Sequence, residues 1–260
     1  MYKTKLNFLL FCLLTPVFFS ACNLLQPTTV PETGVSTSSA ADPGLSNREY
    51  ANRLRNDGWP VEILNTAAQA NYLKDVEKNM VLAHNLIRYD PEKYADLYVS
   101  EYMTYFQGRE FHYPGSDVII LTSEGLRAVR ELHRELKKAE PLPLMFPSKK
   151  LSRAAASHAE YQSRNGEMGH SGQGGMRARI EREGKWQKVI GENIAYGNWS
   201  AHDAIIGLMI DDNVPDRGHR INILSEAFRV MGVAHRTHPE FEGGVYVIKY
   251  AGGFEDVEIE

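Results

Sequence analysis

The sequence contains little cysteine: there are two in 260 residues, Cys12 and Cys22, both near the N-terminus. It also lacks an excess of basic residues, since 29 Lys and Arg face 33 Asp and Glu, for a formal net charge of -4. A mildly acidic surface argues against nucleic-acid binding, which needs a basic face. If the segment that contains Cys12 is removed on export, the mature chain keeps one cysteine and no internal disulfide.

The apolar run at the N-terminus has the form of an export signal. Lys3 and Lys5 precede residues 6–19, which are too short for a comfortable membrane span. Small residues then lead to Cys22, which resembles a bacterial lipoprotein signal whose cleavage leaves Cys22 as the lipidated N-terminus. The alternative is an ordinary signal peptide cut near Ala21. We expect an extracytoplasmic protein anchored by lipid to a bacterial membrane, the outer membrane in a Gram-negative organism.

The rest of the chain has ample apolar material for a core, because 43% of its residues are hydrophobic and 24% are charged. Residues 1–21 are expected to form the signal peptide. Residues 22–45 are rich in Ser, Thr, Pro and Gly and are expected to form a flexible tether. Residues 46–77 are expected to form a helical extension that begins at Ser46.

Hydrophobic periodicity predicts helices and a few strands beyond the tether. The expected helices cover residues 46–57, 66–88, 92–105, 123–138, 151–165 and 201–212. Ser46, Ser123 and Ser200 are placed to cap three of them. The expected strands cover residues 118–121, 229–234 and 245–250. Helices followed by strands predict a layered domain of helices and sheet.

Three short polar motifs concentrate the ionisable residues of the C-terminal half. They are Gly169-His170-Ser171, Gly191-Glu192-Asn193-Ile194 and Gly218-His219-Arg220-Ile221-Asn222-Ile223-Leu224, with the pair Asp211-Asp212 before the third. Two imidazoles and two carboxylates can hold a divalent metal, act as a metal-free general acid and base, or form a buried polar network. Spacing alone leaves these three alternatives open, because the motifs are far apart in sequence.

The three motifs in this order, followed by Val-Met-Gly-Val-Ala, resemble the CAP superfamily. It includes cysteine-rich secretory proteins, venom antigen proteins and plant pathogenesis-related proteins, and the Gly-His-Arg form of the last motif is that of the bacterial SCP-like branch. The resemblance covers about residues 78–254, with His84-Asn85-x-x-Arg88 on the first helix of the family and an insertion at about residues 94–144. It implies an α+β fold, a three-layer α-β-α sandwich with a large cleft, here with an N-terminal helical extension.

The resemblance also implies a site in that cleft. The family has two histidines and two acids there, which bind a divalent metal in some members. His170, Glu192 and His219 match the first histidine, the first acid and the second histidine. Asp211 matches the second acid, and Asp212 is the alternative for this position, although the family usually has a glutamate there. The implied cofactor is Zn²⁺ or another divalent cation, although an aspartate reaches about one methylene less than the glutamate of the family.

Four polar residues beside these are candidates for ligand binding: Ser171, Asn193, Asp212 and Asn222. The alternative for Asn193 and Asn222 is that they tie loops together. Among the other histidines, His158 lies on an apolar helix face and is expected in the core, whereas His202 is expected to be exposed.

Two functions of different classes follow. In the first, a protein anchored through lipid on Cys22 binds a small or lipid-like ligand or a partner protein in the cleft, with or without a divalent metal. In the second, the same cleft belongs to a metal-dependent hydrolase of peptidase type, with Glu192 as the catalytic base. No nucleophile elbow or oxyanion motif is evident around Ser171, which favours a binding protein over an enzyme.

Overall fold

The computed structural model describes residues 24–25, 44–197 and 200–258. The expected signal peptide, the lipidation site Cys22 and most of the expected tether lie outside the described residues. Within the described ranges, no helix combines the length and the apolar character needed to cross a membrane.

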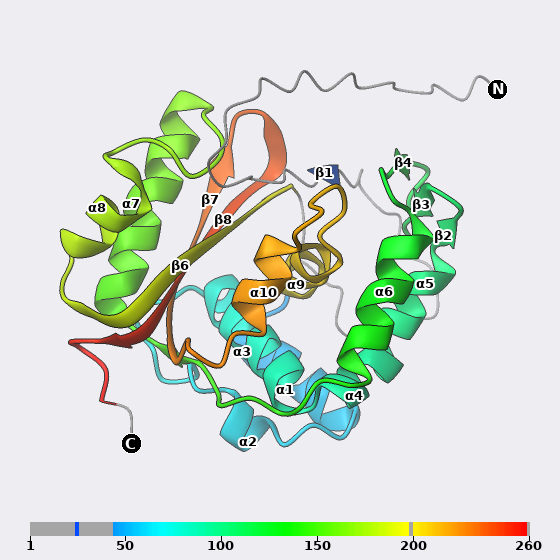
Figure 1. Ribbon diagram of the computed structural model, residues 1–260, viewed down its shortest axis with the longest axis horizontal. Helices are drawn as coiled ribbons and strands as arrows, with labels where there is room; N and C mark the ends of the chain where they lie inside the picture. The colour runs from blue at the N-terminus through cyan, green and yellow to red at the C-terminus, as the bar shows by residue number, and fades with distance from the viewer. Residues whose placement is uncertain (1–23, 26–43, 198–199, 259–260) are drawn as a thin grey trace.

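A five-stranded sheet forms the centre of the fold (Figure 1). Its strands, in spatial order, are β1 (Leu24–Leu25), β6 (Trp186–Gly197), β8 (Phe241–Phe254), β7 (Val230–His238) and β5 (Phe146–Pro147). The long strands β6, β8 and β7 pair antiparallel, and the two short outer strands pair parallel to their neighbours. The Gly-Glu-Asn motif lies inside β6, where residues 191–197 are all buried and so show no alternation of polar and apolar residues.

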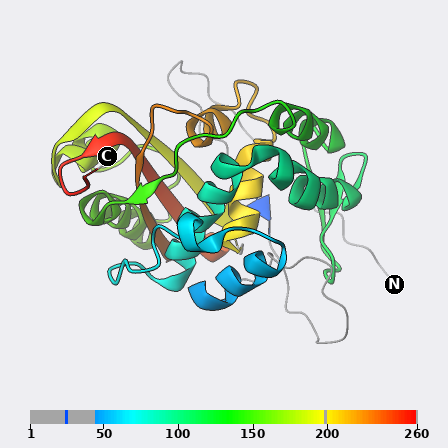
Figure 2. The same ribbon diagram turned by 90° about the horizontal axis from the view of Figure 1, so that it is seen from below.

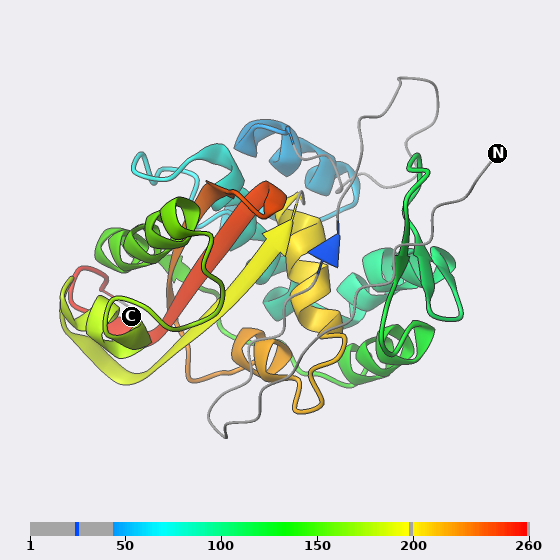
Figure 3. The same cartoon turned by 90° about the horizontal axis from the view of Figure 1, so that it is seen from above.

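Helices cover both faces of this sheet and produce the expected three-layer α-β-α sandwich (Figures 2 and 3). On one face lie α7 (Lys149–Asn165) and α8 (Gly175–Glu181). On the other lie α3 (Asp75–Tyr89), α9 (Ala201–Ile210) and α10 (Gly218–Ile223). The N-terminal extension contributes α1 (Asn47–Asn56) and α2 (Val61–Leu64), which pack on α3.

Serine caps fix the start of several helices, as the sequence predicts. Ser46 and Glu49 form a reciprocal capping box at α1, and the Ser200 hydroxyl accepts the backbone N–H of Asp203 at α9. Ser148 caps α7 in the same way. All ten residues of α9 are buried, which is expected of a helix that is apolar on every side.

Residues 91–136, which cover most of the insertion expected at about 94–144, form a group of short elements beside the sandwich (Figure 1). It contains α4 (Pro91–Tyr94), the π-helical turn η1 (Ala95–Val99), α5 (Ser100–Thr104), the small antiparallel sheet of β2 (Phe106–Gln107), β3 (Glu110–His112) and β4 (Ile119–Leu121), and α6 (Leu126–Leu136). Ser123 does not cap α6. The helix begins after Gly125, which has φ +62°, and the N–H groups of Ser123 and Glu124 bind the carboxylate of Asp212.

One other expectation differs from the structure. The helix expected over residues 66–88 begins only at Asp75, because residues 66–74 form turns. Arg88, near the end of this helix, is fully buried and donates hydrogen bonds to backbone carbonyls of Pro143, Ile223, Ser225 and Phe228 at 2.8 to 3.0 Å. Arg88 therefore joins α3 to the segments around α10 and the start of β7.

Candidate functional site

The candidate site residues come from four different segments. His170 lies in the loop between α7 and α8, Glu192 in β6, Asp211 at the C-terminal end of α9, and His219 in the first turn of α10. Asp211 has φ +56°, a left-handed conformation that aspartate tolerates better than most residues. The helix therefore ends at Asp211, and its side chain is fully buried.

The first pair is His170 with Glu192. The imidazole Nδ1 donates to the Glu192 Oε1 at 2.8 Å. The Glu192 side chain is 1% exposed, and that of His170 is 26% exposed. The ring is thus anchored on a buried carboxylate while part of it still reaches solvent.

Two further cations bind the same carboxylate. The Arg179 Nη2 lies 2.9 and 3.1 Å from the two carboxylate oxygens of Glu192, and the Lys249 ammonium contacts its Oε2. Burial alone raises the pKa of Glu192, but Lys249 nearby, the His170 hydrogen bond and Arg179 together hold that pKa below its usual range. Glu192 is therefore an ionised, buried and charge-compensated carboxylate.

Arg179 also shapes the loop that carries His170. Its guanidinium donates to the backbone carbonyls of His170, Ser171 and Gly172 at 2.7 to 3.2 Å. Gly172 has φ +85° and lies against the Tyr161 ring, so a side chain would be strained there. No hydrogen bond of the Ser171 hydroxyl is seen within the described part of the chain.

The second pair is Asp211 with His219. The His219 Nδ1 donates to the Asp211 Oδ1 at 2.6 Å, and the His219 backbone N–H donates to Oδ2 at 2.9 Å. Both carboxylate oxygens of Asp211 therefore accept hydrogen bonds from His219. Asp212 turns away from this pair and accepts the N–H groups of Ser123 and Glu124, each at 2.7 Å.

A buried polar network links the two motifs that carry Glu192 and His219. Asn193 donates to the His219 carbonyl at 3.0 Å and to the Tyr250 hydroxyl at 3.2 Å, and Asn222 donates to Asn193 Oδ1 at 2.8 Å. The Tyr250 hydroxyl also lies 2.7 Å from His84 Nε2. Asn193 and Asn222 thus tie the loops together, which is the alternative that the sequence left open for them.

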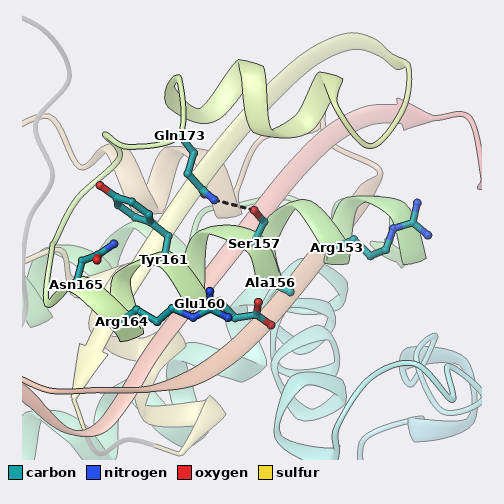
Figure 4. Close-up of a pocket in the computed structure, with 8 residues that line it drawn as sticks. All are labelled: Arg153, Ala156, Ser157, Glu160, Tyr161, Arg164, Asn165 and Gln173. Atoms are coloured by element: carbon teal, nitrogen blue, oxygen red, sulfur yellow. Dashed lines mark hydrogen bonds between the residues drawn. The ribbon is translucent and has the colours of Figure 1, made fainter.

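A surface cavity lies away from these pairs. It measures about 500 Å³ and is lined by one side of α7 and by Gln173, which donates to the Ser157 hydroxyl at 3.0 Å (Figure 4). None of the four candidate metal ligands lines it. The two pairs are instead mostly enclosed, and only the His170 side chain is partly exposed.

The donor set does not fit a divalent metal. Among the described residues, no group of three or more His, Cys, Asp and Glu side chains lies close enough to hold one. His170, Glu192, Asp211 and His219 divide into two pairs, and in each pair the carboxylate binds the imidazole Nδ1. Catalytic zinc usually needs three protein ligands, whereas here the carboxylates orient the imidazoles.

Sequence reasoning missed two charged residues and misplaced a third side chain. Lys249 lies between apolar neighbours in the strand segment 245–250, and such a lysine signals a buried ion pair, but its partner depends on the register of β6 and β8. Arg179 carries no such signal. His202, expected to be exposed, is 2% exposed, and its Nδ1 lies 3.1 Å from the Tyr50 hydroxyl.

Comparisons with known proteins agree with the motif pattern. The model of the CAP, or cysteine-rich secretory protein, family matches residues 81–250. A search of curated proteins gave no significant match.

Solved structures of bacterial proteins show only a partial likeness. An extracellular protein with an SCP domain from Bacillus anthracis is 22% identical, with 48% of this chain and 37% of that chain covered and a TM-score of 0.34. An outer surface protein from Borrelia burgdorferi is 16% identical, with 46% and 84% covered and a TM-score of 0.36. A cysteine-rich secretory protein from Staphylococcus aureus is 14% identical, with 55% and 46% covered and a TM-score of 0.34.

This chain therefore spans less than half of the Bacillus and Staphylococcus chains. The family model, by contrast, covers well over half of the 260 residues and includes all three motifs. The chain belongs to the cysteine-rich secretory protein (CAP) family.

Proposed function

We propose that this chain is an exported CAP-domain protein, anchored by lipid on Cys22, whose two His–carboxylate pairs bind a small or lipid-like ligand or a partner protein. The form of residues 1–22 supports export and the anchor. One observation favours binding over catalysis: each imidazole is held at Nδ1 by a carboxylate, and within the described residues no hydroxyl or thiol is hydrogen-bonded to either ring.

The hydrolase alternative requires Glu192 to act as a general base. An efficient base has a pKa near the working pH, whereas Lys249, His170 and Arg179 hold the pKa of Glu192 below its usual range. The same cations already occupy its oxygens. Glu192 is therefore better suited to orienting His170 than to taking a proton from water.

The binding function is tested with the full chain purified from membranes in mild detergent. Native mass spectrometry of the wild type is compared with that of His170→Ala and His219→Ala. We expect a co-purifying molecule in the wild type whose occupancy falls at least tenfold in either variant. His112→Ala, in the small sheet of the insertion, is the matched control and is expected to keep full occupancy. Equal occupancy in all four proteins would refute the proposed site.

The anchor is tested separately. Cys22→Ala should leave the precursor unlipidated and move the protein out of the membrane fraction, because a single cysteine carries the proposed lipid. Mass spectrometry of the wild-type N-terminus provides the direct readout. An unmodified Cys22 in the mature protein, together with unchanged fractionation of the variant, would contradict the anchor.

A further inference from the structure

The buried cations around Glu192 carry more positive charge than its single carboxylate neutralises. Arg179 and Lys249 bring two positive charges and Glu192 one negative charge, so the sum is one positive charge (2 − 1 = 1) before His170 is considered. The side chains of Arg179 and Lys249 are 0% exposed, and that of Glu192 is 1% exposed. Solvent therefore screens this charge weakly.

The strand register places the Lys249 ammonium at this point. Lys249 lies opposite Glu192 on β6 and opposite Gly232 on β7. A Cβ at Gly232 would overlap the backbone of Leu151 and Ser152, so α7 lies directly on this part of the sheet. The ammonium is enclosed beneath α7, and Glu192 is the one carboxylate that it contacts in the described structure.

We infer that Lys249, assisted by Arg179, takes the place that a divalent metal would need beside Glu192, and that this half of the site is built to work without a metal. A metal ion has to bind carboxylate oxygens directly, and both oxygens of Glu192 already bind cationic nitrogen atoms. An incoming Zn²⁺ would also meet the net positive charge of the buried cluster, which repels it.

The same arrangement explains how His170 is presented. Because Glu192 is held ionised, its Oε1 fixes the Nδ1–H of His170 and leaves the other ring nitrogen for a ligand. A metal would compete with His170 for the carboxylate, whereas the ammonium binds mainly the second oxygen. Lys249 is thus a positioning residue for His170.

The test uses the full chain and follows its melting temperature with Zn²⁺ or ethylammonium as probes. Zn²⁺ should not raise the melting temperature of the wild type through His170. Any small effect of Zn²⁺ on the wild type should therefore be the same in His170→Ala. Lys249→Ala opens a space beside Glu192, and we expect either added cation to raise its melting temperature by several degrees. Lys249→Met fills that space without a charge and should respond to neither probe. Lys185→Ala, at an exposed lysine, controls for general salt effects.

Two results would overturn the inference: a Zn²⁺-dependent stabilisation of the wild type that is lost in His170→Ala, or no response of Lys249→Ala to either cation. If Lys249→Ala does not fold, Lys249→Met is compared with Glu192→Gln. Lys249→Met leaves Arg179 and Glu192 as a neutral buried pair, whereas Glu192→Gln leaves two buried cations without a carboxylate, so Lys249→Met should melt at the higher temperature. A Lys249→Met variant that melts below Glu192→Gln would equally overturn it. The outcome is independent of the ligand experiment, which measures occupancy and uses no metal.

Discussion

At the scale of single residues, Glu192 is the carboxylate that two buried cations share. Glu192→Ala would strand the buried Arg179 and Lys249 without their carboxylate. We expect a loss of about 3–5 kcal/mol in the free energy of unfolding, the range for breaking a buried ion pair on one side. Urea denaturation of the full chain measures it.

The control for this prediction is Glu181→Ala. Glu181 pairs with Arg177 at the surface, where both side chains are largely exposed. Its loss should cost far less than the loss of Glu192, because exposed ion pairs contribute little. Equal losses in the two variants would contradict the charge-compensated cluster around Glu192.

Buried histidines should make the stability depend on pH. Burial lowers the pKa of His84 to about 3, and His84 bridges the Met80 carbonyl and the Tyr250 hydroxyl. Its unfolded pKa is about 6.5, so the unfolded chain binds the proton first as the pH falls. The contribution of a neutral His84 is thus complete above pH 6.5 and is lost progressively towards pH 3, at up to about 1.4 kcal/mol per pH unit.

The measurement compares unfolding free energies between pH 7 and pH 4. His84→Gln cannot titrate, so the slope of its stability against pH should be smaller than that of the wild type by about 1 kcal/mol per pH unit. His112→Gln, at a partly exposed histidine, should keep the wild-type slope. An unchanged slope in His84→Gln would show that another group controls the loss of stability.

At the scale of elements, the insertion helix α6 holds the segment that carries Asp211 and His219. Glu131 of α6 accepts hydrogen bonds from both Arg217 and Arg220 at 2.9 to 3.0 Å. Arg217 also donates to the Asp211 carbonyl at 2.8 Å, and Arg220 to the Met209 carbonyl at 2.7 Å. The acidic side of α6 therefore fixes the C-terminal end of α9 and the start of α10.

Glu131→Gln tests this connection. We expect a loss of about 1–2 kcal/mol in stability, since two charge-assisted hydrogen-bond partners weaken but Glu131 is 36% exposed. Amide hydrogen exchange at His219 should also become faster, because its backbone N–H donates to the Asp211 carboxylate, which the contact with α6 helps to hold in place. Glu135→Gln, which affects only Arg220 at a more exposed position, should leave that exchange rate nearly unchanged.

Helix periodicity, serine caps and the motif order predict the elements of this fold better than they predict its ionic contacts. Ser46 and Ser200 begin helices as expected, because a cap acts within four residues. The pairing of Glu192 with Lys249 depends on the register of β6 and β8, which local sequence does not determine. Ser123 fails as a cap because α6 begins only after Gly125, and the N–H groups of Ser123 and Glu124 bind Asp212, a residue 89 and 88 positions later in the chain.

At the scale of the whole molecule, the N-terminal extension and the insertion share a core with the sandwich. One cluster of buried side chains runs from Tyr50 on α1 to Tyr250 on β8 and includes residues of α3, α6 and α9. Polar contacts also join these parts to the sandwich. The Tyr102 hydroxyl donates to the buried Asp203 at 2.7 Å, and the Tyr50 hydroxyl is hydrogen-bonded to His202. Neither part can bury its apolar surface without the other.

We therefore expect residues 46–146 and 147–260 to unfold together. Calorimetry of the full chain should show one transition, with a calorimetric enthalpy equal to the van't Hoff enthalpy. Each fragment expressed alone should be largely unfolded by circular dichroism, since α3 would expose the face it packs on α9, and α9 would expose apolar side chains all round. Mixing the two fragments should restore structure if the shared core is the main source of stability. Two separate transitions in the full chain, or stable folding of either fragment alone, would mean that the sandwich and the preceding helices are independent units.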